Sequence, residues 1–328
     1  MKALKIFGTI ILIIVAAFLI IPLFLPSEVA VSETQFIKAK PEVVFRQVNE
    51  LKKWFAWSPF EDDTTTVNTF EGPDRGIGAK RSWKGDKSGE GTLTIAVSRP
   101  YEYIENQLTF GENQKAIGSW SFVPRDDGTE VTWTLKTVDL QYPFGKWMGL
   151  MMNSLLQPML EKGLKKLKTV AESLPEPPVV KVIDTDEIRA LVINDSATFQ
   201  GMGEMFQKDY QELYSYLKRK QIPITGERFA IYHDWNPKGY THISPGIPVG
   251  KKVKDYGRIK YLVVPAGKAV FAVHIGGFDT APEHYAIDEY IKDFNLKLKD
   301  FIWETYAFNP VTDTDSTQWK TLIYYPIK

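Results

Sequence analysis

The stretch Phe301-Ile302-Trp303-Glu304-Thr305-Tyr306-Ala307-Phe308-Asn309-Pro310 is dense in aromatic residues and in residues that favour β-structure, so it predicts a strand. Side chains on a strand alternate between faces, and one face would carry Ile302, Glu304, Tyr306 and Phe308. A carboxylate among aromatic side chains is costly to bury without a partner. Two interpretations follow: Lys320, in the next predicted strand, pairs with Glu304, or Glu304 receives a cationic or hydrogen-bonding ligand.

The composition predicts a two-domain globular protein without metal or nucleic-acid chemistry. The chain has 328 residues, no net charge and no basic cluster, which argues against a nucleic-acid partner. The absence of cysteine excludes disulfides, thiolate metal sites and a cysteine nucleophile. The four histidines lack metal-ligand spacing, and no dinucleotide or phosphate-binding loop is present. We therefore expect no metal and no cofactor.

The N-terminus predicts a membrane anchor over residues 1–27. No charged residue occurs from Ile6 to Leu25, about the ~20 residues that cross a bilayer. Lysines precede this run and glutamates follow it, which predicts a cytoplasmic N-terminus, a single pass through the inner membrane, and domains on the periplasmic or extracellular side. A cleaved signal peptide is the alternative, but the segment Leu25–Ala30 lacks a small-x-small cleavage site.

Residues 28–174 predict an antiparallel sheet closed by a long helix. A first strand over Val29–Ala39 and a helix from Pro41 precede five strand-like runs separated by Gly, Asp and Pro. These runs are Gly78–Trp83, Gly89–Ser98, Tyr103–Phe110, Ala116–Val123 and Thr129–Val138. Apolar residues then recur at helical spacing from Trp147 to Ser173, where Pro158 predicts a kink or a delayed start.

This first region resembles the START-like (SRPBCC, polyketide cyclase-like) superfamily. The matching words are Pro41-Glu42-Val43-Val44-Phe45, Trp54 with Trp57-Ser58-Pro59, Gly76-Ile77-Gly78-Ala79, Ser82-Trp83-Lys84-Gly85 and Gly89-Glu90-Gly91. The resemblance implies a helix-grip fold that holds an apolar ligand between sheet and long helix. The candidates for lining such a cavity, each with ordinary core packing as its alternative, are Trp83, Trp120, Trp133, Met148, Met151 and Met152.

A short proline-rich linker at Leu174–Pro178 predicts a boundary, and residues 179–328 predict a second α+β domain. Helices are expected over Met202–Lys220 and Pro282–Leu298. Strands are expected over Ile188–Asn194, Phe229–His233, Ile259–Val264, Ala269–Ile275, Phe301–Phe308 and Trp319–Tyr325. Each half runs from strand to helix to aromatic strand, which suggests a pseudo-duplicated antiparallel module with a cleft between its halves.

The second region resembles the gyrase-inhibitor-like (GyrI-like) domain, also the effector-binding domain of AraC- and MerR-type regulators. The matching words are residues 226–235, Gly246-Ile247-Pro248-Val249, Pro265-Ala266-Gly267, residues 273–278, Trp303-Glu304-Thr305-Tyr306 and Ile323-Tyr324-Tyr325-Pro326. The resemblance implies that Glu304 meets cationic, lipophilic ligands in an aromatic pocket. The other implied ligand-binding residues are Tyr306, Tyr232 and Trp303.

The sequence thus predicts a membrane-anchored protein that senses or sequesters lipophilic, cationic small molecules. The helix-turn-helix segment of the regulators is absent from this sequence, which argues against a transcription factor. One alternative is a hydrolase of electrophilic small molecules, in which Glu304 and Tyr306 activate water and polarise the substrate. Another is a structural module whose pockets are filled by side chains, with Glu304 paired to Lys320.

Overall fold

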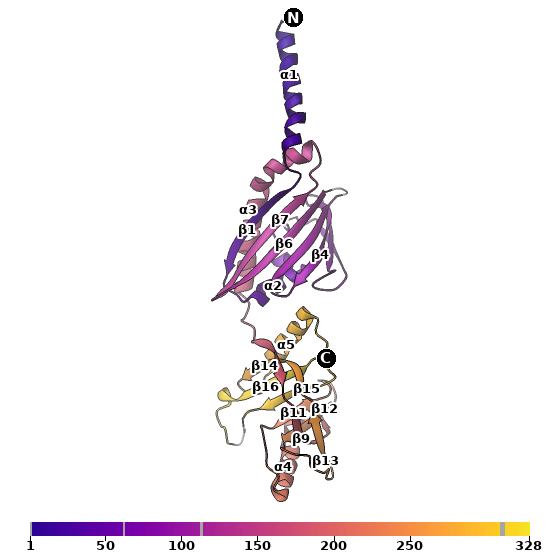
Figure 1. The fold of residues 1–328 in the computed structure, drawn as a ribbon, viewed down its shortest axis with the longest axis vertical. Helices are drawn as coiled ribbons and strands as arrows, with labels where there is room; N and C mark the ends of the chain where they lie inside the picture. The colour runs from indigo at the N-terminus through magenta and orange to yellow at the C-terminus, as the bar shows by residue number, and fades with distance from the viewer. Residues whose placement is uncertain (1, 62, 112–113, 309–311) are drawn as a thin grey trace. The chain divides into compact units, whose positions relative to one another are not determined.

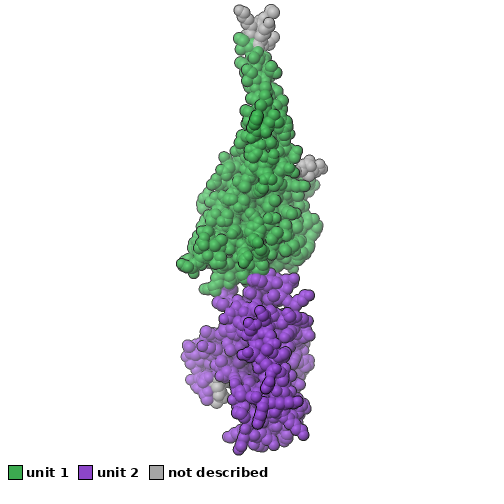
Figure 2. Space-filling view, viewed as in Figure 1, with its two compact units in different colours: residues 1–176 green, residues 177–328 purple. Residues whose placement is uncertain are grey.

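The computed structural model describes residues 2–61, 63–111, 114–308 and 312–328. Asn309 and Pro310, at the end of the quoted stretch, lie outside these residues. The chain divides into two compact units, Met1–Glu176 and Pro177–Lys328, which Figure 2 shows in different colours. Each unit is mixed α+β and is built on its own antiparallel sheet.

The chain begins with an apolar helix, α1 (Lys2–Ile20), which continues into a 3-10 turn, η1 (Ile21–Phe24). Among the described residues, Ile6–Phe24 is the one helical stretch long and apolar enough to cross a membrane, with a mean hydropathy of 3.0. A membrane span and a signal sequence share this property.

The first unit is built on a seven-stranded antiparallel sheet of order β1-β7-β6-β5-β4-β3-β2 in the described chain. The strands are β1 (Val29–Ile37), β2 (Val67–Glu71), β3 (Lys80–Gly85), β4 (Gly89–Arg99), β5 (Tyr103–Phe110), β6 (Gln114–Arg125) and β7 (Gly128–Val138). The predicted meander is confirmed from β3 to β7. The edge strand β2 was not predicted, because its five residues include only two large apolar side chains.

Three helical segments pack with this sheet: α2 (Pro41–Asn49), η2 (Leu51–Ala56) and α3 (Phe144–Glu172). α3 runs alongside β1 (Figure 1) and buries Leu160, Leu164 and Leu167. The helix begins well before Pro158, so the expectation of a delayed start is wrong.

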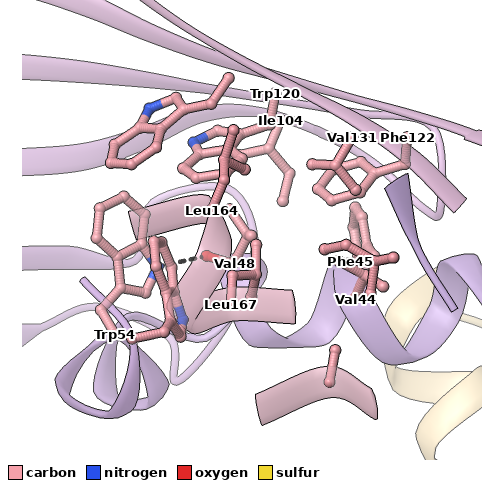
Figure 3. Packing of buried hydrophobic residues seen from close by; sticks show 14 of the residues in the cluster. Val44, Phe45, Val48, Trp54, Ile104, Trp120, Phe122, Val131, Leu164 and Leu167 are labelled. Atoms are coloured by element: carbon pink, nitrogen blue, oxygen red, sulfur yellow. Dashed lines mark hydrogen bonds between the residues drawn. The ribbon is translucent and has the colours of Figure 1, made fainter. Parts of the chain in front are cut away.

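A cluster of four tryptophans fills the space between the sheet and the helices. Trp120 and Trp133 are register partners on β6 and β7, and their rings stack with centroids 4.3 Å apart. Trp57 meets both of them edge-on, and Trp54 lies against Trp57, with its indole N–H donating to the Val48 carbonyl at 2.8 Å (Figure 3). All four side chains are buried, so protein atoms occupy the interior at this level.

Two of these tryptophans differ in whether their indole N–H is hydrogen-bonded, and this difference gives a stability prediction. Trp57 donates its indole N–H to the Gln47 carbonyl at 3.1 Å, whereas the buried Trp120 N–H has no partner among the described residues. Trp57→Phe removes a made hydrogen bond, whereas Trp120→Phe removes a donor that was already unpaired. We expect Trp57→Phe to lower the free energy of unfolding by about 1–3 kcal/mol more than Trp120→Phe. Chemical denaturation followed by circular dichroism measures both, and equal losses would contradict the prediction.

The second unit is built on a nine-stranded antiparallel sheet, in the described chain, of order β13-β9-β12-β11-β15-β16-β14-β8, with β10 paired to β12. The strands are β8 (Val180–Thr185), β9 (Ile188–Ile193), β10 (Asp195–Ala197), β11 (Phe229–Tyr232), β12 (Thr241–Pro248), β13 (Ile259–Val264), β14 (Gly267–Ile275), β15 (Ile302–Tyr306) and β16 (Lys320–Pro326). The helical segments are η3 (Phe199–Gly201), α4 (Met202–Lys220), α5 (Ala281–Phe294) and η4 (Ser316–Gln318).

Several boundaries in this unit agree with the sequence expectations. The predictions for α4 and β13 are confirmed at both ends, and α5 is shorter than predicted because it ends at Asn295 in the left-handed conformation. β12 was not predicted, because Pro245, Gly246 and Pro248 interrupt its apolar pattern.

Both helices cover the same face of this sheet. Leu213 and Leu217 of α4 pack on Leu191 and Ile247, and Ile287 of α5 packs on a second cluster that includes Ala272 and Ile323. Register links these positions across the sheet, because Ala230 lies opposite both Pro245 and Glu304, and Glu304 lies opposite Ile323. Glu304 therefore lies on the helix-covered face, in a row between the parts covered by α4 and α5.

Candidate ligand-binding site around Glu304

The site is centred on the Glu304 carboxylate, which is only 6% exposed. Tyr306, two residues along β15, donates its hydroxyl to Oε2 of Glu304 at 2.9 Å. Tyr232 of β11 donates to the same oxygen at 3.2 Å, and the two tyrosine hydroxyls are 2.8 Å apart. One carboxylate oxygen is thus held by two phenol groups on neighbouring strands.

The other carboxylate oxygen, Oε1, contacts His284 of α5. Nε2 of His284 lies 2.8 Å from Oε1 of Glu304, and Nδ1 of His284 lies 2.8 Å from the Tyr325 hydroxyl on β16. An ionised carboxylate only accepts hydrogen bonds, so Nε2 of the histidine carries a proton in this pair. These five residues, Glu304, Tyr232, Tyr306, His284 and Tyr325, are called the Glu304 cluster below.

The tyrosines of the cluster are held in their protonated form. Burial raises the pKa of Tyr232 and of Tyr306 well above the ordinary value of 10.0, and the nearby charge of Glu304 raises both further. Burial also raises the pKa of Tyr325, with contributions from Asp288 and Glu304. These hydroxyls therefore remain hydrogen-bond donors across the physiological range.

Two aromatic side chains of α4 and the guanidinium of Arg228, the residue before β11, lie next to the Tyr306 ring. Phe206 meets the Tyr306 ring edge-on at 6.2 Å, and Tyr210 stacks on Phe206 at 5.9 Å. The Arg228 guanidinium lies 6.0 Å from the centroid of the Tyr306 ring and 5.2 Å from that of Tyr210. Phe206 of α4 and His284 of α5 thus both contact side chains of β15.

The alternative interpretation, in which Glu304 pairs with Lys320, is wrong. Glu304 lies opposite Ile323 on β16, and Lys320 is three residues away along that strand. An odd separation along a strand places a side chain on the opposite face. Lys320 therefore belongs to the other face of the sheet, and its position is exposed.

Trp303 is also separated from the cluster by this alternation. It neighbours Glu304 in sequence, so its side chain leaves β15 on the opposite face. There it is buried and stacks on Tyr324, with centroids 4.7 Å apart. The structure brings Glu304, Tyr306 and Tyr232 together and places Trp303 in the core behind them.

The other sequence candidates lie in the first unit. Trp120 belongs to the buried tryptophan cluster, and Trp83 packs edge-on against Phe110 at 5.7 Å. Met148 and Met151 are exposed on α3, which contradicts the expectation that they line a cavity under that helix.

His284 and Tyr325 are the cluster members that sequence reasoning missed. A signal for His284 was present, because it precedes Ile287 by three residues and Ile291 by seven, which places all three on one side of a helix. Ile287 is buried against the sheet, and His284 lies on that side with it. The described residues contain no group of three or more His, Cys, Asp or Glu that could hold a metal ion.

Two family models match the chain, one for each unit. Residues 28–172 match the family described as polyketide cyclase / dehydrase and lipid transport, and residues 178–328 match the GyrI-like small molecule binding domain. The chain carries a polyketide cyclase-like domain followed by a GyrI-like domain, and both families indicate small-molecule binding. Among curated proteins, none matches the sequence.

Solved structures share local similarity with the chain. A protein from Chromobacterium violaceum is 16% identical, with 44% of this chain and 98% of that one covered, at a TM-score of 0.35. EcmrR in its DNA complex is 19% identical, with 56% and 70% covered, at a TM-score of 0.44. A hydrolase from Listeria innocua is 15% identical, with 46% and 93% covered, at a TM-score of 0.37. Likenesses this low carry no information about this chain's ligand.

The tyrosine pKa shifts give a pH prediction. A tyrosine in the unfolded chain titrates near 10, whereas folded Tyr232 and Tyr306 retain their protons above that pH. The stability that depends on these protons is fully present below about pH 10 and is lost as pH rises further, because the unfolded state then binds fewer protons. We expect the free energy of unfolding to fall between about pH 9 and about pH 11. In a Tyr232→Phe/Tyr306→Phe variant the fall is expected to be smaller.

Denaturant unfolding at the two pH values measures this difference. Tyr285→Phe, at an exposed position of α5, is the matched control and should keep the parental pH dependence. A double variant with the same pH dependence as the parent would show that these two protons do not contribute.

Proposed function

We propose that the chain is a membrane-anchored protein whose GyrI-like domain binds lipophilic cations at Glu304. One observation carries the proposal. The contacts of this buried carboxylate in the described chain are two tyrosine hydroxyls and one histidine, and none of them is a lysine or arginine.

The energetic argument rests on this lack of a permanent counter-charge. Burial of an ionised carboxylate costs several kcal/mol unless a charge or sufficient hydrogen bonds compensate it. His284 is a counter-ion only when it is protonated. A neutral His284 leaves the negative charge of Glu304 balanced by hydrogen bonds alone, so a cation that also brings apolar surface gains both electrostatic and hydrophobic stabilisation.

The aromatic wall adds a second contribution that favours cations. Arg228 lies over the rings of Tyr210, Tyr306 and Phe308, so these rings already hold one positive charge, and a ligand cation would contact ring faces that Arg228 does not cover. A cation over an aromatic face gains about 0.5–2 kcal/mol, with the larger values in desolvated sites. Tyr306 thus has two roles: its hydroxyl donates a hydrogen bond to Glu304, and its ring can contact a cation.

Membrane anchoring completes the proposal. The stretch Ile6–Phe24 has the length and hydropathy of a span, the residues before it are basic, and those after it are acidic. The proposed topology has residues 1–27 as an anchor with a cytoplasmic N-terminus. The domains over residues 28–174 and 179–328 lie on the other side. The activity is to sense or sequester amphipathic compounds at the membrane surface.

Thermal stability of a fragment starting at Glu28 tests the binding proposal. We expect methyltriphenylphosphonium to raise the melting temperature, because a ligand that binds only the folded state stabilises it, by about 2.7 kcal/mol at about 100 times Kd. Neutral triphenylphosphine oxide, which has similar rings and no charge, should produce little change. Glu304→Gln should weaken binding of the cation at least about tenfold.

The GyrI-like domain offers a matched control for this variant. Glu283 of α5 is also buried, and its Oε2 lies 3.0 Å from Nδ1 of His274. Glu283→Gln therefore alters a second buried glutamate–histidine pair and should leave cation binding unchanged. Equal stabilisation of the parent and Glu304→Gln would refute the assignment of Glu304.

A hydrolase is a second candidate, favoured by the chain of hydrogen bonds from Glu304 through His284 to Tyr325. General acid–base catalysis needs proton-transferring groups positioned next to the substrate, and this chain places a carboxylate, an imidazole and a phenol beside one another. The Tyr306 hydroxyl would polarise the substrate. Incubation of the fragment with an epoxide or another strained electrophile, followed by mass spectrometry, tests this activity. Hydrolysis that is lost in both Glu304→Gln and Tyr306→Phe would support it, and no turnover would leave binding as the function.

A further inference from the structure

The first half of α3 exposes a stripe of large apolar side chains. Phe144, Met148, Met151 and Leu155 follow one another at steps of four, three and four residues, which places them on one side of the helix. Phe144 is 72% exposed, Met151 60% and Leu155 54%. No charged residue occurs from Trp147 to Leu160. An exposed apolar stripe of this size marks an interaction surface.

The stripe is separate from the core-facing side of the helix and stops part-way along it. Gly149 and Leu160 lie on the buried side, and Leu156 is packed against the core. The next positions on the same stripe are Pro158, Lys162, Lys165 and Thr169, all exposed. The solvent side of α3 therefore changes from apolar to polar between Leu155 and Lys162.

The apolar end of α3 is fixed against the end of α1. The Phe18 ring stacks on Trp147 at 6.0 Å and meets Phe144 edge-on at 5.2 Å. The Trp147 indole N–H donates to the Phe18 carbonyl at 3.0 Å, and the Tyr142 hydroxyl donates to the Leu19 carbonyl at 2.7 Å. Figure 1 shows the start of α3 next to this end of α1.

We propose that the stripe Phe144–Met148–Met151–Leu155 is a membrane-docking surface that lies in the interface of the bilayer beside α1. The proposal rests on the proposed anchor, because the level of the stripe is set by where the apolar stretch Ile6–Phe24 ends. Residues that favour the interface surround it: Tyr142, Trp147 and Lys146, whose Nζ donates to the Leu25 carbonyl at 2.9 Å.

The dimensions agree with an interfacial position. Phe144 to Leu155 spans about 16 Å of helix at ~1.5 Å per residue. Interfacial helices bury their apolar side roughly 5–10 Å deep, at the boundary of headgroups and acyl chains. The switch to Lys162 and its lysine-rich surroundings then marks where α3 leaves the interface. A bilayer is the occupant we infer because the stripe is continuous with a helix of membrane-spanning hydropathy.

The absence of cysteine permits a direct test on the full chain. Single variants Met151→Cys, Ile13→Cys and Thr169→Cys each carry a nitroxide label, in vesicles of phosphatidylcholine with a minority of phosphatidylglycerol. Collision of the label with oxygen, which concentrates in lipid, is compared with collision with a water-soluble nickel chelate. All three side chains are exposed, so labelling does not disturb the core.

We expect the oxygen-to-nickel accessibility ratio at Met151→Cys to be several-fold higher than at Thr169→Cys and lower than at Ile13→Cys. A lipid-like Ile13→Cys with a water-like Met151→Cys would overturn the docking surface and leave the anchor in place. A water-like Ile13→Cys would overturn the anchor and, with it, the docking surface. A Met151→Cys label shielded from both reagents would show that protein rather than lipid covers the stripe and would also overturn the proposal.

Discussion

The burial of the Glu304 carboxylate is the constraint on which the candidate site depends. Strand register fixes it at the middle of a nine-stranded sheet, and the cover of α4 and α5 removes it from water. Its negative charge, together with burial, raises the pKa of Tyr232 and Tyr306, and their protonated hydroxyls in turn bind the carboxylate. The cluster is thus mutually stabilised by hydrogen bonds but lacks a permanent positive charge. This lack of a permanent positive charge is the basis of our proposal that the site prefers a cation to a neutral compound.

The two domains contrast in how they use their aromatic residues. In the first unit, Trp54, Trp57, Trp120 and Trp133 pack against one another and fill the interior. In the second unit, Tyr232 and Tyr306 direct their hydroxyls to a carboxylate, and their rings face side chains from α4. Aromatic packing of the first kind supplies stability through buried area and ring contacts. The second kind retains polar groups that a ligand can contact, so the binding proposal rests on the second unit.

The sequence predicted the local parts of the site and missed the non-local ones. Alternation along the strand placed Glu304 with Tyr306, and the spacing of apolar residues gave α4 at both ends. The partner of Glu304 depends on the register between β15 and β16, and the sequences of the two strands do not fix that register. A shift of one residue changes which face Lys320 occupies, so sequence alone could not decide its pairing. The sequence pattern places His284 on the apolar side of a helix. Only the tertiary structure shows that this side brings His284 to Glu304.

The same limit explains the methionines of α3. An apolar helical side looks the same in sequence whether it faces a cavity, a core or lipid, so the sequence could not predict that Met148 and Met151 are exposed. The contact with α1 supports the docking proposal, because a membrane span at α1, as proposed, would bring lipid to the exposed stripe. Lipophilic cations concentrate in membranes for the same reason that this stripe would enter one. A chain anchored as proposed would therefore meet such compounds at a higher local concentration than a protein free in solution, which would lower the affinity that the proposed Glu304 site must supply for sequestration.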